Sequence, residues 1–301
     1  MRQSDRVTLA MFLLVSVLAG GNAVGIRFSN RELDPFWGAG LRFAGAALIL
    51  IAAMFVLKLP IPRRRNLLGA LLYGLLFFAA AFALIYYGLQ ELHAGFGQVL
   101  LALVPLLTLL LAVLERQEVF RWAAAGGGAL ALVGVVVISQ GALRESIPIL
   151  SLLALVGGGI CFAQASIVAG WVRDVHPISI NAVGMAAATV VLIGLSLVTG
   201  ETQMLPDAAA TWLAIAYLIV VGSVVVFVLT VVVIQHWGPT RAAYMLVLIP
   251  VFTVAYSVWL LDEPVGWELV IGGAFVLAGV YVGALRSSKT PTPTITPALE
   301  T

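Results

Sequence analysis

Charged residues are scarce in this sequence. Only 10% of its 301 residues are Asp, Glu, Lys or Arg, while 62% are hydrophobic; an ordinary soluble domain has about 25% charged residues. A chain with so few charges is expected to have lipid, not water, as its main solvent. Because a membrane-spanning helix needs roughly 20 mostly apolar residues, the composition predicts an all-α membrane protein with short loops.

Cysteine and histidine are also rare. The single Cys161 excludes a disulfide within the chain and a metal site built from cysteines. The three histidines lie near predicted helix ends and fit no metal-ligand spacing. The sequence contains no H-E-x-x-H or G-x-S-x-G motif. We therefore expect no metal, no cofactor, no nucleic-acid partner and no enzymatic activity.

Acidic residues are missing from the middle of the apolar segments. All fourteen lie in predicted loops, in the C-terminal tail or at helix ends. Antiporters for cationic drugs commonly need a buried carboxylate that exchanges protons for the drug. A cationic drug is therefore a less favoured substrate.

Ten apolar runs are present, in two sets of five. The first set covers residues 7–28, 36–57, 67–89, 96–114 and 122–139. The second covers 149–171, 178–199, 210–234, 242–261 and 267–285. Each run predicts one transmembrane helix, and the polar residues 287–301 predict a disordered cytoplasmic tail.

The Lys and Arg residues predict the orientation. With a cytoplasmic N-terminus, twelve of the sixteen fall on the cytoplasmic side and only Arg31 and Arg144 fall outside. Since cytoplasmic loops are enriched in Lys and Arg, we expect both termini in the cytoplasm.

An internal repeat joins the two sets of runs. At an offset of 145 positions, identical Phe, Gln, Pro, Thr, Glu, Trp and Gly residues recur. The pairs are Phe82 and Phe227, Gln90 and Gln235, Pro105 and Pro250, Thr108 and Thr253, Glu118 and Glu263, Trp122 and Trp267, and Gly127, Gly128 and Gly134 with Gly272, Gly273 and Gly279. An offset of 142 pairs Asn22 with Gln164 and Pro35 with Pro177. Such matches at a constant offset are hard to produce by chance.

The repeat predicts a first domain at 1–143 and a second at 144–286. Because each holds five helices, an odd number, the second repeat must cross the membrane in the opposite direction. Two inverted repeats around a central cavity suit alternating access, in which one site is exposed to each side in turn. A transporter is therefore the favoured function.

These residues resemble the drug/metabolite transporter superfamily, in particular its ten-helix EamA-type branch. The most specific part is the twice-occurring pattern of a proline-containing apolar helix, a Glu, a Trp and a Gly-rich helix. Overall the chain is similar to bacterial aromatic amino-acid exporters of that branch. The resemblance implies a multi-pass protein of the bacterial inner membrane with a small-molecule substrate, as a monomer or an oligomer.

Arg42 is the main candidate for binding a substrate carboxylate, because it lies about two turns inside the second apolar run. The alternatives are an arginine that reaches outward to the membrane surface, or one that pairs with Asp34 or Glu32. For Arg27 such a role outside the site is favoured.

Amides and aromatic residues supply further candidates. Asn22, Gln164 and Gln98 can bind a substrate's polar groups, although hydrogen bonds between helices are an equally good interpretation for Asn22 and Gln164. The family's cavity-lining pattern favours Phe78, Tyr86 and Tyr244 for an apolar side chain, with lipid-facing or core positions as the alternative.

Glu118 and Glu263 precede predicted helix starts. We favour helix capping over proton transport for both. Pro105 and Pro250 each remove a backbone hydrogen bond and are expected to form a hinge or to shape the cavity.

Together with the resemblance, these observations predict an exporter of small metabolites, with neutral or aromatic amino acids as the favoured substrates. The alternatives are an exporter of a nucleoside, an organic anion or another metabolite or drug, and a lipid translocator.

Overall fold

The computed structural model of the protein describes residues 3–115, 122, 126–131, 133–134, 137, 148–169, 172, 175–237, 245–262 and 265–282. Within these ranges every regular element is a helix, which confirms the all-α fold. The candidates Glu118, Glu263 and Tyr244 lie outside the described residues, as does the predicted tail 287–301.

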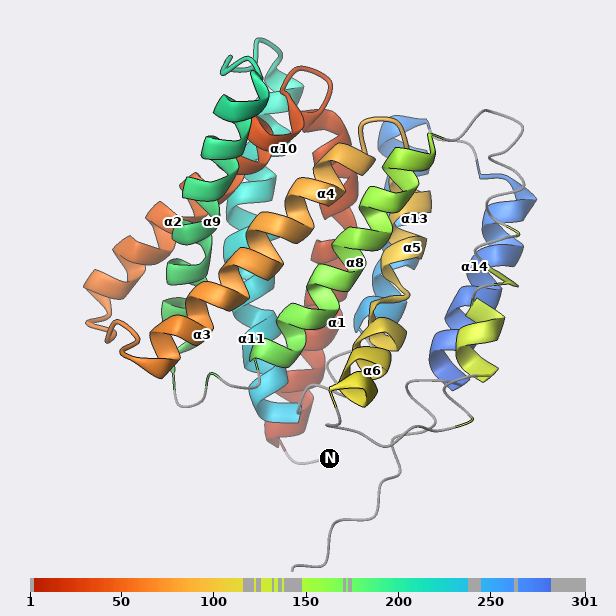
Figure 1. Ribbon diagram of the computed structural model, residues 1–301, viewed down its shortest axis with the longest axis horizontal. Coiled ribbons are helices and arrows are strands. Elements are labelled where there is room, and N and C mark those ends of the chain that lie inside the picture. Colours follow the sequence, from red (N-terminus) through yellow and green to blue (C-terminus); the bar gives the residue numbers. More distant parts are fainter. Residues whose placement is uncertain are drawn as a thin grey trace, which may run out of the picture.

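The helices of the first repeat pack side by side in a bundle with those of the second (Figure 1). They are α1 (Gln3–Ser29), α2 (Pro35–Val56), α3 (Arg65–Gly74), η1 (Leu75–Ala80), α4 (Ala81–Gly88), α5 (Ala94–Leu101) and α6 (Val104–Leu114). The second repeat contains α8 (Ile149–Ala169), α9 (Pro177–Thr199), α10 (Ala209–Ile219), η2 (Val220–Val225), α11 (Val226–Trp237), α13 (Met245–Leu261) and α14 (Trp267–Val280).

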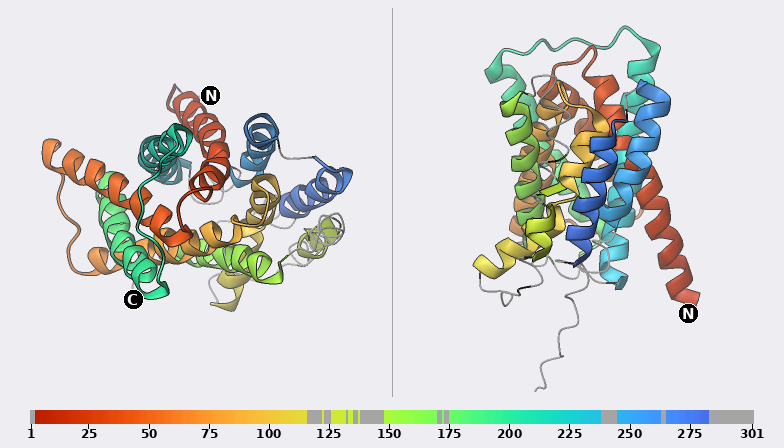
Figure 2. Two further views of the ribbon diagram at one scale, coloured as in Figure 1. Left: turned by 90° about the horizontal axis from the view of Figure 1, so that it is seen from above. Right: turned by 90° about the vertical axis from the view of Figure 1, so that its right-hand side faces the viewer.

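Six helices in the described part of the chain are long and apolar enough to cross a membrane, and three more are apolar but shorter. The α2 and α9 helices lie at one end of the bundle and α14 at the other, in two perpendicular views (Figures 1 and 2). The count of ten helices and the orientation of the termini stay predictions.

Equivalent prolines begin equivalent helices. Pro35 and Pro177 each occupy the first turn of their helix, α2 and α9. Proline suits this position because its φ angle is already helical and the missing N–H would have no partner there. The α9 helix ends at Gly200, whose φ of 75° is a conformation that glycine adopts without strain. The 142-residue offset therefore relates helix starts as well as sequence identities.

The third spanning helix of each repeat contains a π-helical segment. The segments are η1, at Leu75–Ala80, and η2, at Val220–Val225. Their bounds differ by 145 positions, the same offset that aligns Phe82 with Phe227. Well under 1% of residues in soluble proteins are π-helical. Two such segments in register indicate that the repeats share backbone detail as well as sequence.

The Gly-rich helices of the two repeats meet through reciprocal backbone contacts. A Cβ atom added at Gly134 would lie 2.5 Å from the carbonyl oxygen of Gly272, and one added at Gly279 would lie 2.5 Å from that of Gly127. Gly127 and Gly272 are 145 positions apart, as are Gly134 and Gly279. The aligned glycines therefore let two equivalent helices cross at backbone contact, as small residues do in membrane proteins.

The repeats differ at their aligned prolines. In the first repeat the helix is interrupted at residues 102–103, so that α5 ends and α6 begins with Pro105 in its first turn. In the second repeat Pro250 lies inside the uninterrupted α13. The same residue thus marks a break in one repeat and is accommodated within a helix in the other.

Candidate functional site

Arg42 is the largest fully buried side chain of the described residues, with an exposed fraction of 0%. It extends from α2 to η2, where Nε donates to Ser223 Oγ at 2.8 Å and Nη2 donates to the Gly222 carbonyl at 3.0 Å. A longer contact of 3.4 Å joins Nη2 to Asn22 Oδ1 in α1. The arginine therefore links α1 and α2 of the first repeat to the π-helical segment of the second.

Both alternatives for Arg42 are wrong. It does not reach the surface, because it is fully buried. It does not pair with Asp34 or Glu32, whose carboxylates instead accept hydrogen bonds from residues 202–211. The polar partners of Arg42 in the described part of the chain are a hydroxyl, an amide and a backbone carbonyl, all of them uncharged.

Two donors at this position have no hydrogen-bond partner among the described residues. One is Nη1 of Arg42, and the other is the hydroxyl of Tyr86, which is also fully buried. The two side chains lie near each other and interact, but not with the geometry of an ordinary hydrogen bond. A buried polar atom without a partner carries a desolvation cost of about 1–3 kcal/mol, and more for a charged group. A ligand with two acceptor oxygens would remove that cost.

Aromatic rings surround the guanidinium. Its Cζ atom lies 4.6 Å from the ring centroid of Phe82, 5.1 Å from that of Phe43 and 6.0 Å from that of Phe227. Phe78 contacts both Phe43 and Phe227, each at 5.2 Å between centroids. The negative faces of such rings attract a cation. They partly offset the burial of an arginine that has no carboxylate against it.

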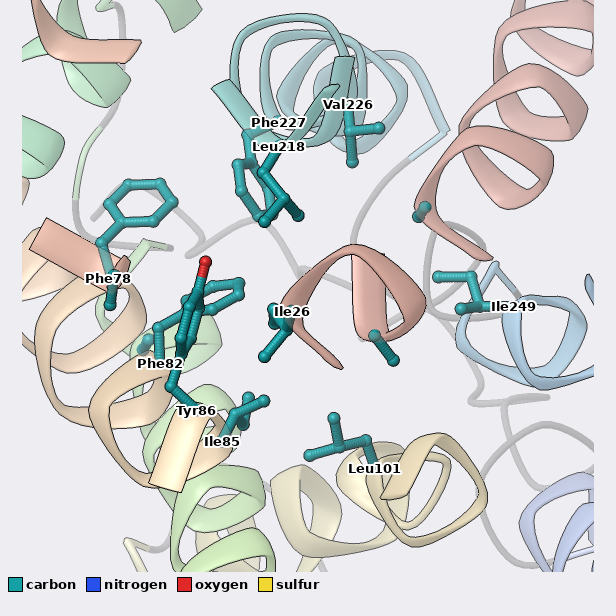
Figure 3. Close-up of a cluster of buried hydrophobic side chains, with 14 of the residues drawn as sticks. Ile26, Phe78, Phe82, Ile85, Tyr86, Leu101, Leu218, Val226, Phe227 and Ile249 are labelled. Atoms are coloured by element: carbon teal, nitrogen blue, oxygen red, sulfur yellow. The ribbon is translucent and has the colours of Figure 1, made fainter. Parts of the chain in front are cut away.

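The rings come from neighbouring helices that belong to different repeats. Figure 3 shows Phe78, Phe82 and Tyr86 on one side and Leu218 and Phe227 on the other, with the Tyr86 hydroxyl pointing toward the space between them. Phe78 lies in η1 and Tyr86 in α4, whereas Phe227 lies in α11. The candidate site is therefore formed by both repeats.

The other sequence-predicted residues are distributed differently. Asn22 is at the site and donates to the Gly222 carbonyl at 3.4 Å. Gln98 is a buried residue of α5. Gln164 donates to Glu115 at 2.8 Å, so it makes the hydrogen bond between helices that was the alternative for it. Although Asn22 and Gln164 are aligned by the repeat, only Asn22 contacts Arg42.

Arg27 binds two backbone carbonyls, which is neither of the contacts that the sequence suggested for it. Its Nη1 donates to the carbonyls of Leu89 at 3.1 Å and Gln90 at 2.8 Å. These carbonyls follow the last turn of α4, where a positive charge is favourable beside the negative end of the helix dipole. Arg27 therefore stabilises a helix end.

Sequence reasoning did not find Gly222, Ser223 and Phe43 as site residues. A glycine, a serine and a phenylalanine within apolar runs carry no signal that separates them from packing residues. A glycine is required at position 222 because the Asn22 side chain lies directly against its backbone, and a Cβ atom there would overlap Asn22 Oδ1. Only the folded arrangement shows that these three residues contact Arg42 or Asn22.

Comparison with known proteins decides the family. The profile of the EamA-like transporter family matches residues 6–140 and again 149–284. The chain belongs to the EamA-like transporter family. As an EamA-like transporter it is a multi-pass protein of the bacterial inner membrane, and the resemblance of its sequence to the EamA-type branch is confirmed.

Several curated proteins are similar over nearly their whole length. The uncharacterized inner membrane transporter YedA of Escherichia coli K12 is 27% identical, over 97% of this chain and 95% of that protein. A probable terminal-alkyne amino-acid exporter of Streptantibioticus cattleyicolor is 29% identical, over 86% and 90%. A probable amino-acid metabolite efflux pump of Escherichia coli K12 is 24% identical, over 90% and 92%.

The EamA-like fold is also found among solved structures. One crystal structure matches with a TM-score of 0.69 and 18% identity, covering 93% of this chain and 97% of that one. At this identity the match supports the fold alone.

Proposed function

We propose that this EamA-like transporter exports neutral amino acids from the cytoplasm, and that Arg42 binds their carboxylate between the two repeats. The observation that carries the proposal is the fully buried guanidinium of Arg42, of which one nitrogen has no hydrogen-bond partner in the described residues. An intramembrane charge is costly and usually marks a substrate or ion pathway.

The chemistry around Arg42 fits an amino acid better than a cation. A carboxylate can accept from Arg42 Nη1 and Tyr86 Oη, neither of which makes an ordinary hydrogen bond to a described residue. The nearby aromatic rings suit an apolar side chain, and they come from helices of both repeats. Two relatives are named as amino-acid exporter and amino-acid metabolite efflux pump, which supports the same substrate class.

A counterflow experiment in proteoliposomes tests the proposal. Wild-type protein should exchange labelled phenylalanine in a saturable way, and the free amino acid should compete far better than its methyl ester. Arg42→Gln should remove this preference, because a hydrogen bond to a charged group is worth roughly 1.5–3 kcal/mol, or roughly 10–150-fold in affinity. Arg42→Lys should restore part of it.

Arg27→Gln is the matched control, since Arg27 binds helix-end carbonyls away from the site. It should lower thermal stability and leave the preference for the free acid unchanged. An equal loss of binding for acid and ester in well-folded Arg42→Gln protein would show that Arg42 is structural and would contradict the proposal.

A further inference from the structure

The two π-helical segments have different chemistry at equivalent positions. Phe77 and Phe78 of η1 are aligned, at an offset of 145, with Gly222 and Ser223 of η2. π-helical segments within α-helices occur frequently at functional sites. Here one segment carries two aromatic rings, and the other carries a hydroxyl and a closely approached backbone carbonyl.

Each segment packs on the opposite repeat, again at equivalent positions. Ser223 and Gly222 accept hydrogen bonds from Arg42 of α2. Phe78 packs on Gly184 of α9, where an added Cβ atom would lie 3.3 Å from Phe78 Cε2. Arg42 and Gly184 are 142 positions apart, the offset that relates the first two helices of the repeats. The two repeats therefore form the same helix contact twice. In one copy Arg42 lies beside Ser223, and in the other Gly184 lies beside Phe78.

We propose that this difference orients the substrate, with its carboxylate on the η2 side and its side chain on the η1 side. Phe78 is then a residue that determines side-chain specificity, and the substrate class is neutral amino acids with a large apolar or aromatic side chain. The inference rests on the proposed export of amino acids and adds the direction in which the molecule lies.

The ring contacts identify Phe78 as the surface for the side chain. Its ring lies 5.2 Å from the ring centroid of Phe43, 5.2 Å from that of Phe227 and 5.0 Å from that of Phe77. Gly184 packs against the edge of this ring without a Cβ atom, since one added there would lie 3.3 Å from Phe78 Cε2. A substrate ring can replace one of these contacts with a similar one, because aromatic pairs prefer centroid distances of roughly 4.5–7 Å.

The carboxylate end belongs to the other segment because the positive charge is held there. Nε and Nη2 of Arg42 are bound to Ser223 and Gly222, which leaves Nη1 as the nitrogen without a partner. Ser223 therefore positions the guanidinium. The reverse orientation would place the carboxylate beside η1, where Gly184 occupies the position equivalent to Arg42 and supplies no positive charge.

The experiment compares two selectivity ratios in proteoliposome counterflow of labelled phenylalanine. The side-chain ratio compares competition by phenylalanine and by alanine, and the carboxylate ratio compares phenylalanine and phenethylamine. Phe78→Ala should lower the side-chain ratio about tenfold or more, within the 10–200-fold that a hydrophobic pocket gives per methylene, and leave the carboxylate ratio unchanged. Ser223→Ala should lower the carboxylate ratio and leave the side-chain ratio unchanged.

Phe78→Leu keeps most of the side-chain volume and should lower the side-chain ratio less, which keeps the test valid if Phe78→Ala folds poorly. Phe55→Ala is the control, because Phe55 is 76% exposed on α2, and both ratios should match wild type. Unchanged ratios in both Phe78 variants, or equal changes in the two ratios, would overturn the orientation while amino-acid export stands. Absence of amino-acid exchange by the wild-type protein would overturn the proposed function and the orientation together.

Discussion

Glu32 and Glu201 each bind the start of a helix in the other repeat. Glu201, which follows α9, accepts hydrogen bonds from the backbone N–H groups of Phe36 at 3.0 Å and Trp37 at 2.8 Å, in the first turn of α2. Glu32, which precedes α2, accepts from the N–H groups of Asp207 at 2.7 Å and Ala208 at 3.1 Å, just before α10. The two loops are thereby joined at the end of the bundle that the sequence predicts to face outward.

The segment from Glu201 to Ala208 extends across that end of the bundle (Figure 2). Asp34 adds to the same connection by accepting from the N–H and hydroxyl groups of Thr202, both at 2.8 Å. Carboxylates satisfy the free N–H groups of a helix start and face the positive end of its dipole. These contacts hold the two loops together at this end.

Acid should weaken this connection. The pKa of Glu32 is lowered from its ordinary value of 4.5, first by the hydrogen bond from the Thr211 hydroxyl and then by the amides of Ala208 and Asp207, against the raising effect of burial. A lowered folded-state pKa means that the stabilisation is complete above the ordinary pKa and is lost as the pH falls through the folded-state pKa. The melting temperature of the detergent-solubilised protein should therefore fall on acidification below about pH 4.5.

Glu32→Gln should lower the melting temperature at neutral pH and flatten its decline in acid. Glu268→Gln is the control, because Glu268 lies in the first turn of α14, away from this connection, and its acid profile should follow wild type. A Glu32→Gln protein with the full wild-type decline would show that other groups cause it.

The reciprocal glycine contacts predict two equal losses of stability. Gly134→Leu and Gly279→Leu each place a side chain where even a Cβ atom would be 2.5 Å from a carbonyl oxygen. Overpacking of this kind costs typically 1–3 kcal/mol. Chemical denaturation in detergent should show similar losses for both variants.

Gly126→Ala is the matched control, since a Cβ atom added there meets no heavy atom of another described segment within 4 Å. Alanine is also the better helix former, so this variant should be at least as stable as wild type. A large loss at Gly134 with none at Gly279 would contradict the equivalence of the two contacts.

The predicted orientation is measured with reporter fusions or cysteine labelling. Both termini and the loop with Arg63, Arg64 and Arg65 should be found in the cytoplasm, because Lys and Arg are enriched there. Detection of either terminus on the outside would remove the basis for the inversion of the repeats.

Glu118 and Glu263 remain predicted caps. Glu118→Gln and Glu263→Gln should lower thermal stability, since a dipole interaction of roughly 0.3–1 kcal/mol is lost with the charge, and should leave the pH dependence of transport unchanged. Loss of proton-linked transport in well-folded protein of either variant would instead support a role in proton transfer.

The sequence predicts the architecture better than the site. Its constant offset reveals the repeat, and the aligned glycines and prolines occupy equivalent places in the structure. The π-helical segments could not be predicted, because LLFFAA and VVGSVV share no residue at any aligned position. Two segments with such different residues are not expected to favour the same rare π-helical conformation by themselves. We therefore attribute the position of the π-helical segments to packing against the other repeat.

The partners of Arg42 show the same limit. The sequence suggested Asp34 and Glu32, within ten positions of Arg42, as its alternative partners. The observed partners Gly222 and Ser223 are about 180 positions away. A single sequence does not specify which of several apolar helices face each other, because nearly all of their faces are hydrophobic. The identity of the charged residue was predictable, and its surroundings were not.

The interruption before Pro105 has a consequence for how the transporter moves. In the proposed alternating access by inverted repeats, each repeat adopts in turn the conformation that the other one has now. In the opposite state we therefore expect the chain to become helical at residues 102–103 and to break at 247–248, which are helical in α13. Because both prolines lack the N–H that would close the turn, neither arrangement gains a backbone hydrogen bond over the other at the proline. The helix interruption would then alternate between the two repeats, before Pro105 in one state and before Pro250 in the other, with each transport cycle.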